Sequence, residues 1–162
     1  MGRFLTAILV AALCLIAGCG VYTFNPKGKS SISSVAVERF ANKTAQYGIE
    51  DQMTDQVIDA LIADGTLKVV AREYAEAVLT GVLARYERRV HDYDENDQVK
   101  TYAVEMYFDI ELIKPGDETE IWKESVGHTG IYDAASETEE DGQQKAITLL
   151  VEAILNKTTK SW

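Results

Sequence analysis

Apolar and polar residues alternate along the chain with two different periods, and these periods predict its strands and helices. Residues 34–40 alternate with a period of two, which predicts a strand, and Asn42 and Thr44 predict a loop after it. From Tyr47 to Asp64, apolar residues recur every three or four positions, which predicts an amphipathic helix that stops at Gly65. The apolar stripe of this helix consists of Ile49, Met53, Val57, Ala60 and Leu61.

Further apolar stretches predict strands at residues 67–71, 78–90, 99–113 and 121–131. The third is the strongest, because its apolar side chains fall on one face and its polar side chains mostly on the other. Pro115 and Gly116 suit the centre of a type II turn that joins it to the returning strand, on which Trp122 and Val126 share the inner face. Residues 73–77 fit either a turn of helix or a bend.

A last helix is predicted from about Glu137 to Lys157. Ser136 and Glu139 form a capping box, acidic residues follow at the positive end of the helix dipole, and Lys157 and Lys160 lie near the negative end. The bulky Trp162 is expected to dock on the body of the domain. The order of strand, helix, three or four strands and helix predicts an α+β fold with a single domain over residues 35–162. Two helices pack on one face of a small, about four-stranded mixed sheet.

The first residues of the sequence predict where in the cell the protein is located. Arg3 gives a positive start, residues 4–17 form an apolar run of about 15 residues, and small residues precede Cys19. This is the pattern of a bacterial lipoprotein signal at residues 1–18, with Cys19 as the lipid attachment residue. An apolar run of this length is shorter than the roughly 20 residues that a spanning helix needs. An ordinary secretory signal and an N-terminal membrane anchor are the alternatives.

Cysteine usage agrees with this interpretation. Cys14 would leave with the signal and Cys19 would carry the lipid, so no disulfide is expected in the mature chain. Residues 19–34 are rich in Gly, Asn, Lys and Ser and are expected to form a lipidated tether. Gly20 stands where an Asp would favour the inner membrane, so we expect the periplasmic face of the outer membrane.

The net charge of -10 restricts the partners. A negative field repels nucleic acid at long range, so no nucleic-acid partner is expected, and an anionic ligand would need a local basic patch. The densest basic cluster is Arg85, Arg88 and Arg89. In an unbroken strand, Arg85 and Arg89 share a face, and Lys100 approaches from the paired strand. These arginines either pair with nearby acids such as Glu87 and Glu105 or bind phosphate through their planar donor forks.

Candidate catalytic chemistry is scarce, so we expect neither an enzyme nor a cofactor. The two histidines, His91 and His128, are expected on the solvated surface, and no free cysteine is left for a Cys–His pair. Residues 92–97 resemble a calcium loop. However, Asp97 stands where the sharp turn needs Gly, and Ala103 stands where the bidentate Glu belongs. An acidic hairpin tip is the better interpretation, and no metal site is predicted.

Several short blocks, in this order, resemble the LptE family of lipopolysaccharide-assembly lipoproteins. The blocks are Gly18–Phe24, Val35–Val37, Phe40–Thr44, Leu67–Val70, Ala75–Gly81, Tyr86, Tyr93–Asp94, Ile121–Trp122, Tyr132 and a last helix that ends near Trp162. Together they cover nearly all of the mature chain.

The resemblance implies a partner protein without catalytic activity. Members of this family plug the large outer-membrane β-barrel translocon (LptD-like), help it assemble and bind lipopolysaccharide. Arg85, Arg88 and Arg89 are nominated for lipopolysaccharide phosphate on charge alone. An anchored periplasmic adaptor, such as a cell-wall synthase activator or a secretion-assembly component, is the alternative function.

Overall fold

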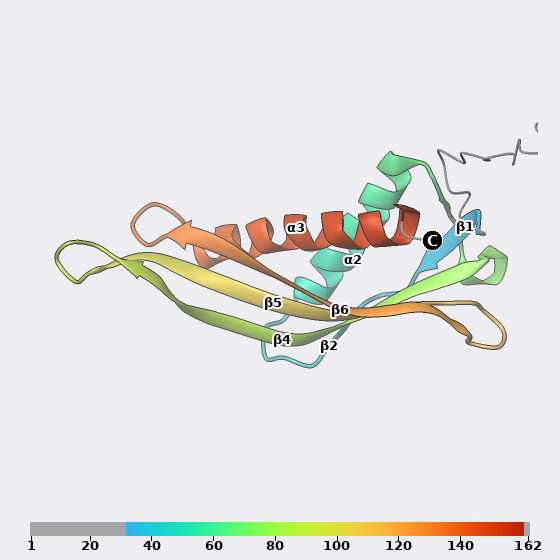
Figure 1. The fold of residues 1–162 in the computed structure, drawn as a ribbon, viewed down its shortest axis with the longest axis horizontal. Helices are drawn as coiled ribbons and strands as arrows, with labels where there is room; N and C mark the ends of the chain where they lie inside the picture. The colour runs from blue at the N-terminus through green and yellow to red at the C-terminus, as the bar shows by residue number, and fades with distance from the viewer. Residues whose placement is uncertain (1–31, 161–162) are drawn as a thin grey trace, which may run out of the picture.

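The computed structural model describes residues 32–160, and Figure 1 shows an elongated sheet with two helices above it. The predicted lipid attachment residue Cys19, the predicted signal and Trp162 lie outside the described residues, as does nearly all of the predicted tether. In chain order, the elements are β1 (Ser34–Val37), β2 (Ala41–Asn42), α2 (Ile49–Asp64), β3 (Lys68–Val69), the 3₁₀ turn η1 (Arg72–Tyr74), β4 (Ala77–Tyr93), β5 (Val99–Ile113), β6 (Glu120–Asp133) and α3 (Glu139–Lys160).

The sheet is mixed and has six strands, more than predicted. Its order is β3–β1–β4–β5–β6, with β2 pairing β4 off this path. The pairs of β1 with β3 and β4, and of β2 with β4, are parallel, whereas the long strands β4, β5 and β6 form an antiparallel meander. Among the described residues, β2 is the strand that was not predicted, and at two residues it is too short for a periodic signal in the sequence.

The predicted strand over residues 34–40 is wrong at its carboxyl end, because β1 stops at Val37. The amide of Phe40 leaves the sheet and donates to Thr54 Oγ1 on α2 at 2.9 Å. The Phe40 ring is fully buried, 6.0 Å from the ring of Phe108 between centroids. Gly81 makes room for it, since a Cβ there would lie 2.8 Å from the Phe40 ring. Burial of one aromatic ring therefore ends the strand.

Two other boundaries differ from the sequence-based prediction. The strand expected at residues 67–71 shrinks to β3, because Leu67 turns into the core. Residues 73–77, for which a turn of helix and a bend were open, contain both: η1 ends at Tyr74, Glu76 is a bend, and β4 begins at Ala77. The turn after β5 agrees with expectation, since Gly116 has a φ of 106° and Lys114 N–H donates to Thr119 O at 2.9 Å.

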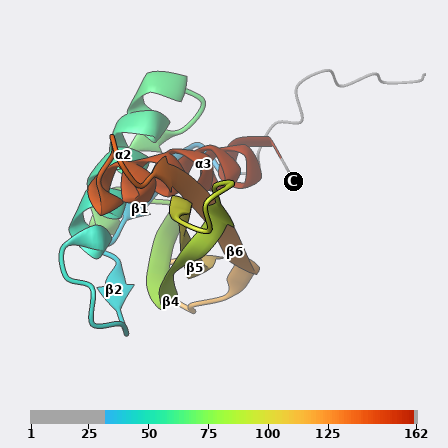
Figure 2. The same ribbon diagram turned by 90° about the vertical axis from the view of Figure 1, so that its left-hand side faces the viewer.

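Both helices cover the same face of the sheet and share one core with it (Figure 2). Five alternate residues of β5 supply its centre and are fully buried: Val104, Met106, Phe108, Ile110 and Leu112. Trp122 and Val126 pack at the edge of this core, as predicted. At the other side of the core, α2 ends at Gly65, whose positive φ lets its N–H donate to Leu61 O at 3.1 Å.

The second helix begins two residues later than predicted, with a different cap. Thr138 Oγ1 accepts from Asp141 N–H at 3.3 Å, and Asp141 Oδ2 accepts from Thr138 N–H at 2.8 Å. Ser136 instead donates from its hydroxyl to Asp133 at 2.9 Å. The capping box is therefore Thr138 with Asp141, because the turn at Asp133 already holds Ser136.

Candidate functional site

One face of the long meander carries no helix and is polar, and we call it the open face. Its side chains lie opposite the buried alternate residues of β5, since successive residues of a strand point to opposite faces. Within the described part of the chain, both long helices lie on the other side. The open face consists of Thr80, Val82, Arg85, Glu87 and Arg89 of β4, Ala103, Glu105, Tyr107, Asp109 and Glu111 of β5, and Lys123, Ser125, Gly127, Thr129 and Ile131 of β6.

The three nominated arginines do not form one patch. Arg85 and Arg89 lie on the open face, as the sequence predicted for an unbroken strand, although β4 has a bulge between Leu83 and Arg85. Arg88 pairs in register with Val104, a core residue, and so points to the helix side of the sheet. Arg88 and the other two arginines therefore lie on opposite faces of the sheet.

Arg88 belongs to a cluster that fastens α3 to the sheet, and we call this cluster the α3 clamp. Its guanidinium lies 3.8 Å from the Tyr102 ring centroid, and its Nε donates to Tyr132 Oη at 2.5 Å and lies 3.3 Å from Glu139 Oε2. Tyr86 Oη donates to the other oxygen of Glu139 at 2.5 Å. The clamp consists of Tyr86, Arg88, Tyr102, Tyr132, Glu139 and Gln143, since Gln143 Nε2 donates to Tyr86 Oη at 2.9 Å.

The clamp changes the acidity of its central phenol. Burial raises the pKa of Tyr86 well above its ordinary value, and the hydrogen bond to Glu139 raises it further. Tyr86 therefore stays a neutral donor at physiological pH and holds the first turn of α3. Arg88, Tyr132 and Glu139 act together with it as structural residues.

On the open face, Arg85 and Arg89 have different surroundings. Arg89 Nη2 lies 2.6 Å from Glu105 Oε1, so the cross-strand pairing foreseen in the sequence holds for this residue. Arg85 stacks on Tyr107, with its guanidinium carbon 3.9 Å from the ring centroid. The Tyr107 ring lies against Gly127 of β6, where an added Cβ would come within 2.4 Å of it. Among residues 32–160, no ion-pair partner is found for Arg85.

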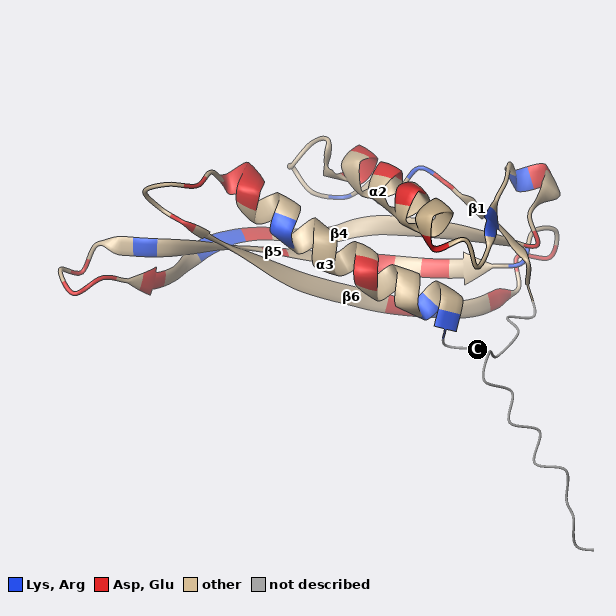
Figure 3. Cartoon of the chain, turned by 90° about the horizontal axis from the view of Figure 1, so that it is seen from above, with Lys and Arg blue, Asp and Glu red and all other residues tan. Residues whose placement is uncertain are grey.

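Lys100 does not approach the arginines. It lines a hollow between the β4–β5 hairpin and the turn after β6, together with Asp94, Gln98 and Asp133. Backbone N–H donors, chiefly that of Gln98, hold the pKa of Asp94 below its ordinary value, and the Ser136 hydroxyl lowers the pKa of Asp133. Lys100 adds a smaller lowering to the pKa of each carboxyl. These acids serve as turn caps in the loops at the ends of these strands, where acidic positions are coloured red in Figure 3.

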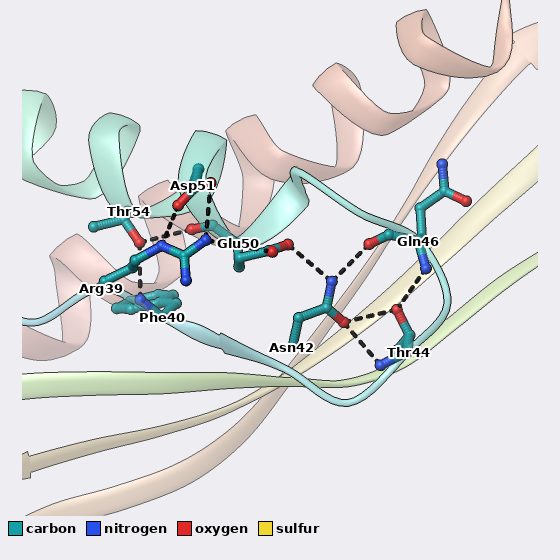
Figure 4. Close-up of polar contacts among 8 residues, drawn as sticks. All are labelled: Arg39, Phe40, Asn42, Thr44, Gln46, Glu50, Asp51 and Thr54. Atoms are coloured by element: carbon teal, nitrogen blue, oxygen red, sulfur yellow. Dashed lines mark hydrogen bonds and ion pairs between the residues drawn. The ribbon is translucent and has the colours of Figure 1, made fainter.

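The loop from Arg39 to α2 is held by a polar network around Asn42 (Figure 4). Asn42 Nδ2 donates to Gln46 O at 2.6 Å and to Glu50 Oε2 at 2.8 Å, while Asn42 Oδ1 accepts from Thr44 N–H at 2.8 Å. Arg39 Nε donates to Asp51 Oδ1 at 2.5 Å. The block of residues 40–44 that carries the family resemblance therefore joins the sheet to the start of α2.

Two features are absent from the part of the chain that the structure describes. No helix there is long and apolar enough to span a membrane. In residues 32–160, no group of three or more His, Cys, Asp or Glu side chains is placed to hold a metal ion.

The family was decided by comparison with known proteins. The model of the LptE family, described as lipopolysaccharide-assembly, matches residues 32–158. The chain belongs to the LptE family. Its general role is therefore in lipopolysaccharide assembly, as the sequence resemblance suggested. No curated protein matched the chain.

Solved structures similar to this LptE-family chain support the fold alone. A protein from Xanthomonas campestris aligns with a TM-score of 0.59 at 14% identity, covering 83% of this chain and 87% of its own. A hypothetical protein from Chlamydia trachomatis aligns with a TM-score of 0.56 at 10% identity, covering 78% and 97%. A minor lipoprotein from Acinetobacter baumannii aligns with a TM-score of 0.52 at 12% identity, covering 78% and 92%.

The sequence alone did not show how the family blocks meet in space. Phe40 of one block lies over Gly81 of another, and Tyr86 and Tyr132 of two others meet in the α3 clamp. Neither partnership has a local signal, because the paired residues are far apart in the sequence. These blocks therefore maintain the fold that presents the open face.

Proposed function

We propose that this chain is a non-enzymatic outer-membrane lipoprotein, anchored through Cys19, that plugs and helps assemble the β-barrel lipopolysaccharide translocon. The observation that carries the proposal is the open face. A three-stranded, mostly polar surface on an elongated domain fits the wall of a water-filled lumen. Membership of the LptE family supports the link to lipopolysaccharide assembly.

The charges of the open face suit a polar partner better than a lipid tail. Glu105, Asp109 and Glu111 form a central row on β5, and only part of this charge is compensated, by Arg89 and by Lys123 at 3.5 Å from Glu111. Desolvating such a row against hydrocarbon would cost several kcal/mol per ion, roughly, whereas hydrated or hydrogen-bonding surfaces keep it solvated. The interior of a hydrophilic barrel meets this requirement.

Of the three arginines, Arg85 is the best candidate to bind lipopolysaccharide phosphate. Its guanidinium is fixed on Tyr107 and retains its hydrogen-bond donors, whereas those of Arg89 face Glu105. Arg88 is committed to the α3 clamp. We therefore expect the double variant Arg85→Ala, Arg89→Ala to weaken lipopolysaccharide binding without unfolding the domain. Unchanged binding by the triple variant that also carries Arg88→Ala would exclude the arginine cluster as a phosphate site.

The proposed partner is tested by pull-down of the full, tagged chain from its own envelope in mild detergent. We expect a large outer-membrane β-barrel to be recovered, and Glu87→Arg on the open face to reduce that recovery. The matched control is Asp59→Arg, which makes the same charge change on an exposed position of α2. Glu87 lies opposite Glu105, so its reversal relieves a like-charge pair and should not harm folding.

Each outcome decides between classes of partner. Recovery of a cell-wall synthase or a secretion assembly instead of a barrel would favour the adaptor function and contradict the proposal. Equal loss of the barrel with Glu87→Arg and Asp59→Arg would show that the open face is not the contact surface.

A further inference from the structure

The outer edge of β6 is an unpaired strand edge in the described part of the chain. In the order β3–β1–β4–β5–β6, β6 is terminal and pairs only with β5. Three hydrogen bonds fix which residues face outward. Ala134 N–H donates inward to Lys100 O, whereas Ile131 O accepts from Lys145 Nζ and Asp133 N–H donates to Glu137 Oε2. By the two-residue period, Ser125, Gly127 and Thr129 also point their backbone groups outward.

Those backbone groups have no protein partner within residues 32–160. The side chains of Lys145 and Glu137 satisfy the edge only at Ile131 and Asp133. Natural proteins usually protect a long edge strand with proline, a bulge or a central charge. Between Ser125 and Ile131, β6 has neither a proline nor a bulge, and it contains no Lys or Glu. The edge is therefore left able to pair.

Helix α3 adds an apolar strip alongside this edge. Lys145 reaches Ile131 O, and Lys157 Nζ lies 2.9 Å from Glu124 Oε2, so these residues place one stripe of α3 along β6. Leu149 and Ala153 continue that stripe at intervals of one helical turn between the two lysines. Leu149 is 41% exposed, an unusual position for a large aliphatic residue unless something covers it.

A second copy of the chain does not fit this edge. The backbones of α3 and β6 are in direct contact, since a Cβ at Gly130 would lie 1.9 Å from Gly142 O. Two paired β6 strands would be about 4.8 Å apart, whereas packed helices need about 8–10 Å between their axes. The two copies of α3 would therefore collide. A single extended segment without a helix of its own avoids the collision.

We propose that the β6 edge receives an extended segment of a partner protein, which adds a strand beside Ser125–Thr129 and lays an apolar side chain on Leu149. Main-chain hydrogen bonds would supply affinity, and the Leu149–Ala153 strip would select small or β-branched apolar residues at alternate positions. This inference does not depend on the barrel proposed above, because any extended segment of this pattern would satisfy the edge.

The test uses the mature chain, labelled with ¹⁵N, and a synthetic peptide of alternating threonine and valine with glutamate at both ends. Binding should slow amide exchange at Ser125, Gly127 and Thr129 by about tenfold or more, while the inward amides of β6, already bonded to β5, change little. The same peptide with N-methyl groups on alternate residues should not bind, because it lacks the donors that pair. Protection elsewhere, or equal binding by both peptides, would overturn the proposal.

Two variants test the edge and the strip separately. Ser125→Pro removes an outward N–H that the fold does not use, and we expect it to abolish peptide binding, whereas Ser125→Ala keeps the N–H and the binding. Circular dichroism on both variants would verify the fold. Leu149→Asp should weaken peptide binding about tenfold, since the apolar side chain of the peptide would face a carboxylate. Ile62→Asp, at another exposed aliphatic position on α2, should not weaken it. Equal binding by Leu149→Asp and the unchanged chain would show that the Leu149–Ala153 strip does not contact the peptide.

Discussion

At the scale of single residues, glycine decides how closely the layers approach. Gly130 of β6 faces Gly142 of α3, and this pair lets the helix backbone rest on the strand. Gly127, three residues earlier, faces the Tyr107 ring on the open face. The two positions differ in what can move, because a helix backbone is fixed by its own hydrogen bonds and a surface ring is not.

We therefore predict that Gly130→Ala is far more harmful than Gly127→Ala. The new methyl at residue 130 overlaps Gly142 O and must displace α3, so the free energy of unfolding should fall by about 3 kcal/mol or more. At residue 127, Tyr107 can rotate toward solvent, and the loss should stay near 1 kcal/mol, roughly. Urea denaturation followed by circular dichroism measures the free energy of unfolding of both variants. Equal losses of stability would show that α3 can shift away from residue 130 at little cost.

At the scale of elements, the start of α3 is fixed twice, by its cap and by the α3 clamp. The cap is Thr138 with Asp141, and the clamp holds Glu139, which lies between them, through Tyr86 and Arg88 of β4. A sequence pattern identified a capping box in this region but assigned it to Ser136 and Glu139. Ser136 is held in the preceding turn by Asp133, and Glu139 accepts from Tyr86 of β4, so neither side chain caps the helix.

The cap assignment predicts the effect of two alanine substitutions. Thr138→Ala should lower the free energy of unfolding by about 1 kcal/mol, because Asp141 N–H loses its acceptor. Ser136→Ala should cost less than half of that, since it removes only an exposed turn contact. Thermal unfolding compares the two variants directly. A larger loss of stability for Ser136→Ala would favour the capping box of Ser136 and Glu139 that the sequence suggested.

The same cap predicts a pH dependence. Hydrogen bonds from Thr138, first from its backbone N–H, hold the pKa of Asp141 below its ordinary value. The stabilisation is therefore complete above the unfolded pKa of about 3.9 and is lost as pH falls through the lower folded pKa. The stability difference between the unchanged chain and Asp141→Asn should shrink below about pH 4. A difference that grows on acidification would contradict the assigned hydrogen bonds.

At the scale of the whole molecule, the sheet forms one layer and the two helices form a second layer on one of its faces. The other face of the long strands is left mostly polar. This arrangement exposes two distinct surfaces, the open face and the β6 edge, for which we propose partners. The predicted lipid attachment residue, Cys19, lies outside the described residues.

Lipid attachment can therefore be tested apart from folding. Cys19→Ala should abolish incorporation of labelled palmitate in cells, while Cys14→Ala, within the signal, should leave incorporation unchanged. The mature domain should keep its circular dichroism spectrum in both cases, because residues 32–160 form the core without either cysteine. Label that persists in Cys19→Ala would exclude this residue as the attachment point.

The sequence by itself determined the class of fold, the family and the elements with strong periodicity. The alternate apolar residues of β5 and the stripe of α2 are local patterns, and burial of one face imposes them wherever such elements pack. Tertiary structure alone decided the end of β1 at Phe40, the short strand β2 and the role of Arg88 in the α3 clamp. These depend on contacts between residues far apart in the chain, for which periodicity contains no information.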